Sequence, residues 1–296
     1  MDLTAREILK SEVRPALGCT EPAAAALAAA AAASLLPRRI PEKIEVRLDA
    51  NVYKNALAAV VPGGGGGKGP ALAAALGALG GDAHLGLQVL APVDAGRLAE
   101  AAGLVAAGRV EVTPDYNEQG IFVSVRIMTD GQTAEAVIRD RHDRLTRLRL
   151  DGREVSSPLI VDEKTGGKNM VSHEQLRRLT LARLLAMTES LDDEDLAFIR
   201  EGVIMNRRLA EHGLGVPSGL GVGRALRKIL ERDNRGQDLI AAARCHAAAA
   251  ADARMAGAPL PAMSSAGSGN HGLTAVLPVW TLFESLGGDE IGRAHV

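Results

Sequence analysis

The apolar positions of the chain follow two different periods, and the change between them divides the sequence. Residues 2–14, 93–107, 173–190 and 193–212 place apolar side chains every three or four positions, which is the spacing of an amphipathic helix. Pro15 ends the first of these helices, because proline removes a backbone donor. These segments predict a body built mainly from helices.

From Arg109 onward the period becomes two, as expected for strands with one buried face. The alternating segments are separated by the turn signals NEQG, DG and RHD, which are typical of hairpins. KIEVRL at 43–48 alternates in the same way. Together these stretches predict one small mixed sheet, made from KIEVRL, RVEVTP, IFVSVRIM, QTAEAVIRD and RLTRLRL.

Several shorter segments complete the picture. The apolar run Ala23–Leu36, with Thr20 as its expected N-cap, predicts a buried helix that is too short and too rich in alanine to span a bilayer. Further helices are expected at 71–79, 226–232, 239–255 and 273–286, with loops at 213–223 and 259–272.

These elements predict an α+β fold, with a mainly helical body and an inserted small mixed α/β sheet subdomain. We expect the helical body to comprise residues 1–40 and 173–296, and the insertion, with its glycine-rich loop 62–70, to comprise 41–155. The polar, aperiodic segment 156–172 is the expected linker. Because GGDEIGRAHV begins a helical pattern and stops within it, we expect the chain to be incomplete at its C-terminus.

Composition limits the classes of function. Aromatic residues make up only 2% of the 296 residues, so the core must be built from Ala, Leu, Val and Ile. A net charge of −2 argues against a nucleic-acid or membrane-surface partner. Two cysteines and a polar, charged start without a secretory signal favour a reducing, cytoplasmic location. The oligomeric state stays open, a homo-oligomer included.

The strongest motif is DARMAGAPLPAMSSAGSGNHG at 252–272. Two prolines break the preceding helix, small residues and hydroxyls follow, and a new helix begins nearby. Backbone N–H groups in such a loop can converge on an anion beside a helix N-terminus, which suits a carboxylate or a phosphate. The alternative is a flexible linker, but the flanking apolar segments favour the anion site. Its candidate residues are Ser264, Ser265, Gly267, Ser268, Gly269 and Asn270.

Cys19 lies in a second motif, GCTEP, at or beside the start of a predicted helix. A helix N-terminus stabilises a thiolate, so Cys19 is a candidate reactive group. A buried cysteine that packs as a small apolar residue is an equally good interpretation. Glu21 complements the helix dipole.

Lys54, Asn55 and Lys68 are weaker candidates for ligand binding. The first two follow the first predicted strand, and the third lies in the glycine run. Lys68, in PGGGGGKGP, does not complete a phosphate-binding P-loop, because Pro62 and Gly69 stand where that motif needs Gly and Ser or Thr. Lys54 and Asn55, in NVYKN, follow a strand, although a solvated lysine is the simpler interpretation. Cys245 and His246 are adjacent and have no second pair at metal-binding spacing, so no metal site is expected.

Taken together, these motifs resemble one family, the L-cysteine desulfidases, which are related to the alpha part of iron–sulfur L-serine dehydratases. The resemblance covers essentially the whole chain. GCTEP and PAMSSAGSGN are its specific motifs, whereas the glycine runs alone are not. It rests on EVRPALGCTEPAAAALA, NVYKNAL, PGGGGGKG, ALGALGG and DARMAGAPLPAMSSAGSGNHG.

The resemblance implies a cytoplasmic lyase that converts L-cysteine to pyruvate, ammonia and hydrogen sulfide. It also implies a [4Fe–4S] cluster with one iron open to substrate. In this chain it would place Cys19 in the active site, as the base, and Ser264–Asn270 around the substrate, with Lys54, Asn55 and Lys68 as weaker candidates.

The chain departs from the family pattern in its cysteines. The family's cluster ligands lie in a helical C-terminal section beyond the matching region, and this chain offers only Cys19 and Cys245. Two cysteines cannot supply the usual thiolate ligands, so this chain is not expected to hold the cluster. An L-serine dehydratase-like enzyme, a non-catalytic amino-acid-binding protein and an unstable fragment stay open as alternatives.

Overall fold

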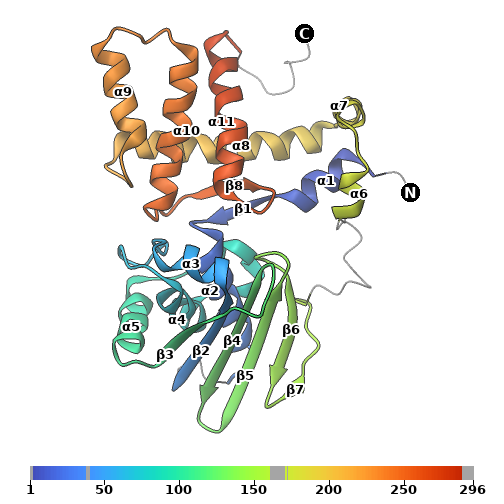
Figure 1. Cartoon of the computed structure of the whole chain (residues 1–296), viewed down its shortest axis with the longest axis vertical. Helices are drawn as coiled ribbons and strands as arrows, with labels where there is room; N and C mark the ends of the chain where they lie inside the picture. The colour runs from blue at the N-terminus through green and yellow to red at the C-terminus, as the bar shows by residue number, and fades with distance from the viewer. Residues whose placement is uncertain (1–2, 38–40, 161–170, 172, 289–296) are drawn as a thin grey trace. The chain divides into compact units, whose positions relative to one another are not determined.

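The computed structural model describes residues 3–37, 41–160, 171 and 173–288 (Figure 1). The chain forms two compact units. The first, which we call the sheet unit, comprises Ala16–Glu163 and Met255–Pro259. The second, which we call the helical unit, comprises Met1–Pro15, Lys164–Arg254 and Leu260–Val296.

The sheet unit contains one six-stranded sheet in the order β3-β2-β4-β5-β6-β7. β2 and β3 run parallel, and the remaining neighbours are antiparallel. Its strands are β2 (Lys43–Asp49), β3 (Val110–Asp115), β4 (Phe122–Thr129), β5 (Gln132–Arg139), β6 (Leu145–Leu150) and β7 (Arg153–Glu154). Its helices are α2 (Thr20–Ala33), α3 (Ala50–Leu57), α4 (Pro70–Gly80), the 3₁₀ helix η1 (Ala83–Gln88) and α5 (Ala95–Ala106).

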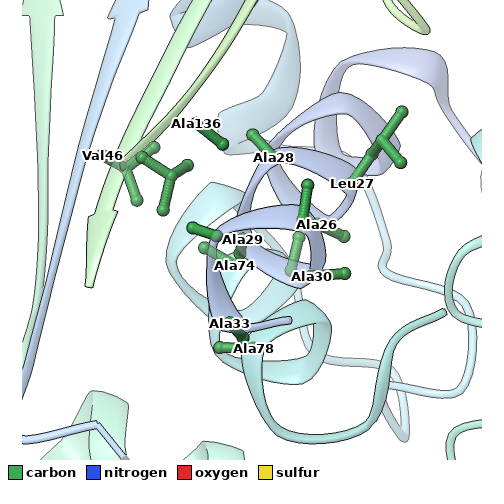
Figure 2. Packing of buried hydrophobic residues seen from close by; sticks show 14 of the residues in the cluster. Ala26, Leu27, Ala28, Ala29, Ala30, Ala33, Val46, Ala74, Ala78 and Ala136 are labelled. Carbon is green, nitrogen blue, oxygen red and sulfur yellow. The ribbon is translucent and has the colours of Figure 1, made fainter. Parts of the chain in front are cut away.

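The core of the sheet unit is made largely of alanine. α2 is buried on nearly all sides and packs against α4 and against strands β4 and β5 (Figure 2). Backbones approach closely there: a Cβ at Gly77 would lie 2.2 Å from the carbonyl oxygen of Ala26. Small side chains are therefore a requirement of this helix pair, which explains why so few aromatic residues suffice.

Adding one methyl group at this contact is expected to destabilise the sheet unit. Gly77→Ala should lower its free energy of unfolding by about 1–3 kcal/mol through overpacking, despite the better helix propensity of alanine. Gly103→Ala in α5 is the matched control, because a Cβ there meets nothing within 4 Å; it should stabilise by about 0.5–1 kcal/mol. Urea unfolding followed by hydrogen exchange of the α2 and α4 amides measures both. Equal effects of the two substitutions would contradict the close contact.

The helical unit is organised around its longest helix, α8, which packs against β8 and α11. The short strands β1 and β8 form a two-stranded sheet. The elements of this unit are α1 (Ala5–Glu12), β1 (Val13–Leu17, which crosses the boundary between the units), α6 (His173–Arg177), α7 (Leu181–Thr188), α8 (Asp193–Gly215), α9 (Val222–Arg232), α10 (Leu239–Met255), β8 (Pro261–Ser265) and α11 (Gly269–Ser285).

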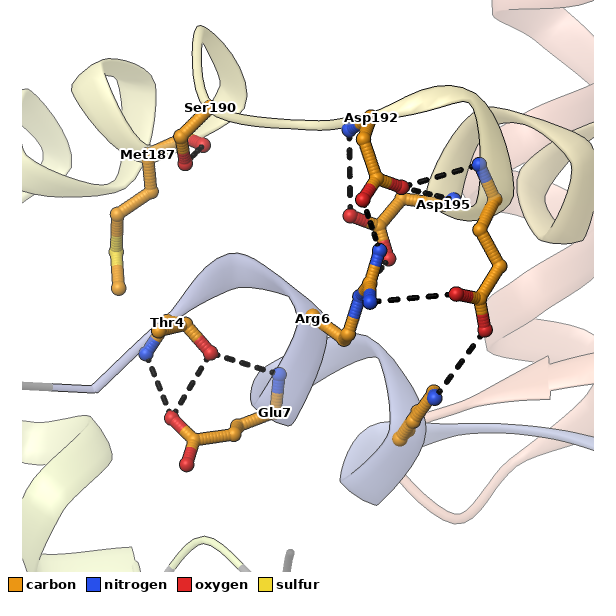
Figure 3. A network of polar contacts seen from close by, with 9 residues as sticks. Thr4, Arg6, Glu7, Met187, Ser190, Asp192 and Asp195 are labelled. Atoms are coloured by element: carbon orange, nitrogen blue, oxygen red, sulfur yellow. Dashed lines mark hydrogen bonds and ion pairs between the residues drawn. The ribbon is translucent and has the colours of Figure 1, made fainter.

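A network of ion pairs joins α1 to the start of α8 (Figure 3). Arg6 Nε donates to the buried carboxylate of Asp195 at 2.8 Å, and its Nη2 contacts Asp192, the N-cap of α8. Thr4 and Glu7 form a capping box at the start of α1. These contacts fix the N-terminal helix against α8 although the two are far apart in sequence.

The fold confirms the expected α+β class, and the sheet contains the strands that the alternating pattern predicted. Three strands, β1, β7 and β8, were not predicted. The first helix was expected to continue to residue 14, but it ends at Glu12 because β1 begins at Val13 and includes Pro15. The segment 259–272 was expected to be a loop, but it contains β8. β1 and β8 are only five residues long and pair with each other across the sequence, and β7 has only two residues, so none of the three has a local signal.

The structure also divides the chain at other positions than expected. Residues 16–37 belong with the sheet rather than with the helical body, because α2 packs on α4 and on the sheet. The N-cap of α2 is Cys19, not Thr20. The expected helix 173–190 is interrupted between α6 and α7. The linker expected at 156–172 lies mostly outside the described residues.

Among the described residues, no helix is long and apolar enough to cross a membrane.

Candidate functional site

A strand, a tight turn and a helix start follow one another in the segment that the sequence singled out. β8 ends at Ser265, and α11 begins at Gly269. Ser265 N donates to Ser268 O at 3.2 Å, and Ser268 N donates to Ser265 O at 3.0 Å. Between them Ala266 and Gly267 have φ values of +48° and +73°, as in the two-residue turns of hairpins. The expected loop is thus a rigid turn that leads directly into a helix.

The backbone N–H groups of this turn are only partly used by the chain itself. Ala266 N donates to Glu12 O at 3.1 Å, and His271 N donates to the Ser268 side chain, the N-cap of α11. The N–H groups of Gly267 and Gly269 have no acceptor among the described residues. Because the N-terminus of α11 adds partial positive charge, these donors suit a carboxylate oxygen.

Two buried side chains hold the segment in place. Asn206 of α8 is fully buried; its Oδ1 accepts from Met263 N at 2.8 Å, and its Nδ2 donates to the carbonyls of Met263 and Gly272 at 3.3 and 3.5 Å. Ser264, a predicted substrate ligand, is 2% exposed and donates to Arg14 O at 2.5 Å. In this structure the Ser264 hydroxyl therefore pairs β8 with β1.

A buried arginine lies behind the turn. Arg254, at the end of α10, is 4% exposed, and its Nη1 donates to Asn270 Oδ1 at 3.0 Å. A Cβ at Gly269 would lie 2.3 Å from Arg254 Nε, so only glycine lets the guanidinium approach the helix start so closely. This contact orients the Asn270 side chain and adds positive charge to the predicted anion site.

Ser265 and His271 form a side-chain pair at the same turn. Ser265 Oγ lies 2.6 Å from His271 Nδ1. The imidazole is exposed and the serine is half-buried. A hydroxyl in contact with an imidazole can pass a proton to it, which is the pairing that general acid–base and nucleophilic catalysis use.

The remaining candidates lie in the sheet unit. Cys19 is 5% exposed, stands at the N-cap of α2, and its Sγ contacts Met255 Sδ at 3.4 Å. Asn55 Nδ2 donates to Glu21 Oε1 at 3.2 Å. The structure thereby joins the GCTEP motif to the NVYKN motif on α3.

The two lysine candidates are exposed. Lys54 lies on α3, and Lys68 lies in the glycine loop opposite Val60. The loop uses its own amides: Gly64 N donates to Val61 O, Gly67 N to Gly64 O, and Gly69 N to Ala59 O. These three donors are used within the sheet unit and are not available to a ligand.

His142, between β5 and β6, is a titratable group near Glu21 that the sequence did not single out. Burial lowers the pKa of His142 from its ordinary value of 6.5, and the carboxylates of Glu21, Asp143 and Asp49 oppose that shift. Since the folded pKa lies below the unfolded one, the stability that the neutral imidazole contributes is present above about pH 6.5 and is lost as the pH falls through the folded pKa.

This predicts an acid-sensitive sheet unit. Urea unfolding, followed by fluorescence of Tyr53 and Tyr116, should show lower stability at about pH 5.5 than at about pH 7.5, and His142→Gln should reduce that difference. His246→Gln is the control, because His246 also has a pKa lowered by burial but lies in the helical unit. If His142→Gln leaves the pH dependence of the tyrosine signal unchanged, the assignment is wrong.

The described residues do not fit an iron–sulfur cluster, which is held by cysteine thiolates. They contain no group of three His, Cys, Asp or Glu residues that could hold a metal ion. Cys245 is buried, its Sγ donates to Gly223 O at 3.2 Å, and burial raises the pKa of its thiol. It is therefore a structural thiol rather than a ligand.

Sequence reasoning missed four residues of these sites. Arg254 and His271 lie inside the motif 252–272. A charged guanidinium and an imidazole within a stretch of small residues were the signal that could have identified them. Asn206 stands on the apolar stripe of α8, between Val203 and Leu209, where a polar residue must have a buried partner. The remaining one, His142, had no local signal.

Comparison with known proteins gives consistent matches. A model of the serine dehydratase alpha chain family matches residues 98–294, which include the turn at 265–268 but not Cys19. A UPF0597 protein of Desulforapulum autotrophicum is 48% identical over 306 residues, covering 100% of this chain and 69% of its own length. A UPF0597 protein of Desulfotalea psychrophila is 46% identical, with 100% of this chain and 70% of its own length covered.

A more distant relative, a UPF0597 protein of Clostridioides difficile, is 37% identical over 92% of this chain and 64% of its own length. No solved structure matches the chain.

Proposed function

The chain belongs to the serine dehydratase alpha chain family, and on that premise we propose that it is an L-cysteine desulfidase-like lyase. The reaction removes the α-proton of L-cysteine and breaks its Cβ–S bond, so that sulfide leaves. The resulting aminoacrylate hydrolyses to pyruvate and ammonia. Dehydration of L-serine is the second candidate, since it is the same elimination with hydroxide as leaving group and the family name favours it.

One observation carries the proposal: the strand–turn–helix segment Pro261–Ser285 has two backbone N–H groups without an acceptor among the described residues. Gly267 and Gly269 offer backbone N–H groups, and the start of α11 adds partial positive charge. Arg254 holds Asn270 at the same place. Every α-amino acid carries a carboxylate next to the reacting Cα–H bond, so fixing it positions that bond.

Two groups are candidates for the proton transfers. The first is the Ser265–His271 pair, which lies in the same segment. The Ser265 hydroxyl can accept the α-proton of the substrate while it passes its own proton to His271 Nδ1. The reverse transfer then protonates the leaving group. Cys19 is the base that the family resemblance implies. Because the described residues do not fit a cluster, the roles proposed for these side chains do not depend on iron.

The test is an anaerobic assay of this chain and of the Desulforapulum autotrophicum relative, each as purified and after treatment with iron and sulfide followed by removal of the excess sulfide. Equal amounts of pyruvate and sulfide from L-cysteine, or pyruvate from L-serine, are the expected products. Activity lost in His271→Ala and kept in Cys19→Ser would assign the proton transfers to the Ser265–His271 pair, and the reverse to Cys19. Binding of either amino acid without pyruvate from either protein would refute the lyase and leave an amino-acid-binding protein.

A further inference from the structure

A cavity lies in the helical unit, at the opposite end of β8 from the turn. Its volume is about 370 Å³, and residues of α8 line it together with Leu260 and Pro261. Since β8 has five residues, four steps of about 3.3 Å, or about 13 Å of strand, separate its first residue from its last. The cavity is therefore distinct from the proposed carboxylate site at Gly267 and Gly269.

The charged side chains of this cavity favour an anion. Arg200, Glu201 and Arg208 line it, which leaves one net positive charge. Arg200 and Arg208 are exposed and have no ion pair or hydrogen bond within the part of the chain that the structure describes. Arg207, by contrast, faces α11 and pairs with Glu284 at 3.2 Å. Two unpaired guanidinium groups at one cavity are good carboxylate donors.

The floor of the cavity is apolar. Ile204 stands one helical turn from each of the two arginines and is 42% exposed, although it is a large aliphatic side chain. Met205, Leu260 and Pro261 continue this surface, and all three are half-buried. A ligand that fits must therefore combine a negative charge with an aliphatic body, because inorganic anions would leave the apolar floor in water.

We propose that this cavity binds a small aliphatic carboxylate, with its carboxylate on Arg200 or Arg208 and its hydrocarbon part on Ile204 and Leu260. The ligand touches both α8 and the residue that begins β8. Binding therefore stabilises the packing of β8 on α8, which Gly202 and Asn206 make through Met263. The proposal does not depend on the lyase activity.

Calorimetric titration of the full chain with 4-methyl-2-oxopentanoate tests the proposal. Saturable binding is expected, with affinity at least about tenfold weaker for the double variant Arg200→Ala/Arg208→Ala, because the variant removes both guanidinium donors to the carboxylate. Acetate, which lacks the aliphatic body, and 3-methyl-1-butanol, which lacks the charge, should bind much more weakly. Arg109→Ala, an exposed arginine of the sheet unit, is the control and should leave the affinity unchanged.

Three results would overturn the proposal: no saturable heat, binding of the alcohol as tight as that of the carboxylate, or full affinity in the double variant. Displacement by excess L-serine would also contradict it, because it would place the ligand at the turn. Trp280 fluorescence confirms that the helical unit of the double variant is folded, since the only tryptophan of the chain lies in α11.

Discussion

Replacement of Asn206 with alanine is expected to lower the free energy of unfolding of the helical unit by about 3 kcal/mol. The substitution removes the acceptor of Met263 N and the donor to the carbonyls of Met263 and Gly272, and it leaves these groups buried. Each buried group without a partner costs about 1–3 kcal/mol. Urea unfolding followed by Trp280 fluorescence measures the change.

Two further variants make that result specific. Asn206→Asp keeps an acceptor for Met263 N but turns the donor into a second acceptor that faces two carbonyls, so it should be at least as destabilising as alanine. Gln237→Ala removes an exposed amide side chain of the same unit and should change stability by less than about 0.5 kcal/mol. A loss of similar size in Gln237→Ala and Asn206→Ala would mean that Asn206 does not hold β8.

Replacement of Arg254 with methionine is expected to weaken the binding of L-serine and L-cysteine at least about tenfold. The variant removes the donor that holds Asn270 Oδ1 at 3.0 Å, together with the positive charge behind Gly269. A hydrogen bond that involves a charged group contributes about 1.5–3 kcal/mol, which corresponds to a tenfold effect or more. Calorimetric titration with each amino acid measures it.

Because a buried arginine also supports the fold, the effect on binding needs its own controls. Arg254→Lys keeps the charge but not the planar fork, so its affinity should lie between those of the wild type and Arg254→Met. Arg207→Met removes another arginine that contacts α11, over Trp280 and beside Glu284, and should leave the affinity unchanged. Equal losses in Arg207→Met and Arg254→Met would refute a local role for Arg254.

Local patterns predicted the longer strands of the sheet unit because these strands are long enough to show an alternation of apolar and polar residues. β4 and β5 have eight residues each, buried on one side, and a DG turn signal between them. β1 and β8 have five residues and no such alternation, and each depends on a partner about 250 positions away, as in the bond from Ser264 to Arg14. Pairing between segments so far apart cannot be recognised from the residue pattern of a short stretch of sequence.

The local structure of the motif 252–272 was predicted only in part. The motif 252–272 correctly indicated small residues before a helix N-terminus, yet the helix begins at Gly269 rather than at Leu273. Ser264, expected at the substrate, bonds to the backbone instead. Arg254 could not be assigned from spacing, because only the folded chain brings the end of α10 against Gly269.

The central claim is that the turn between β8 and α11 binds the carboxylate of an L-amino acid. Backbone amide NMR of this chain, titrated with L-serine and with L-serinol, which lacks the carboxylate, tests that claim most directly. The account predicts saturable shifts of the Gly267 and Gly269 resonances with L-serine and none with L-serinol. Unchanged resonances with L-serine, or equal shifts with L-serinol, would contradict it.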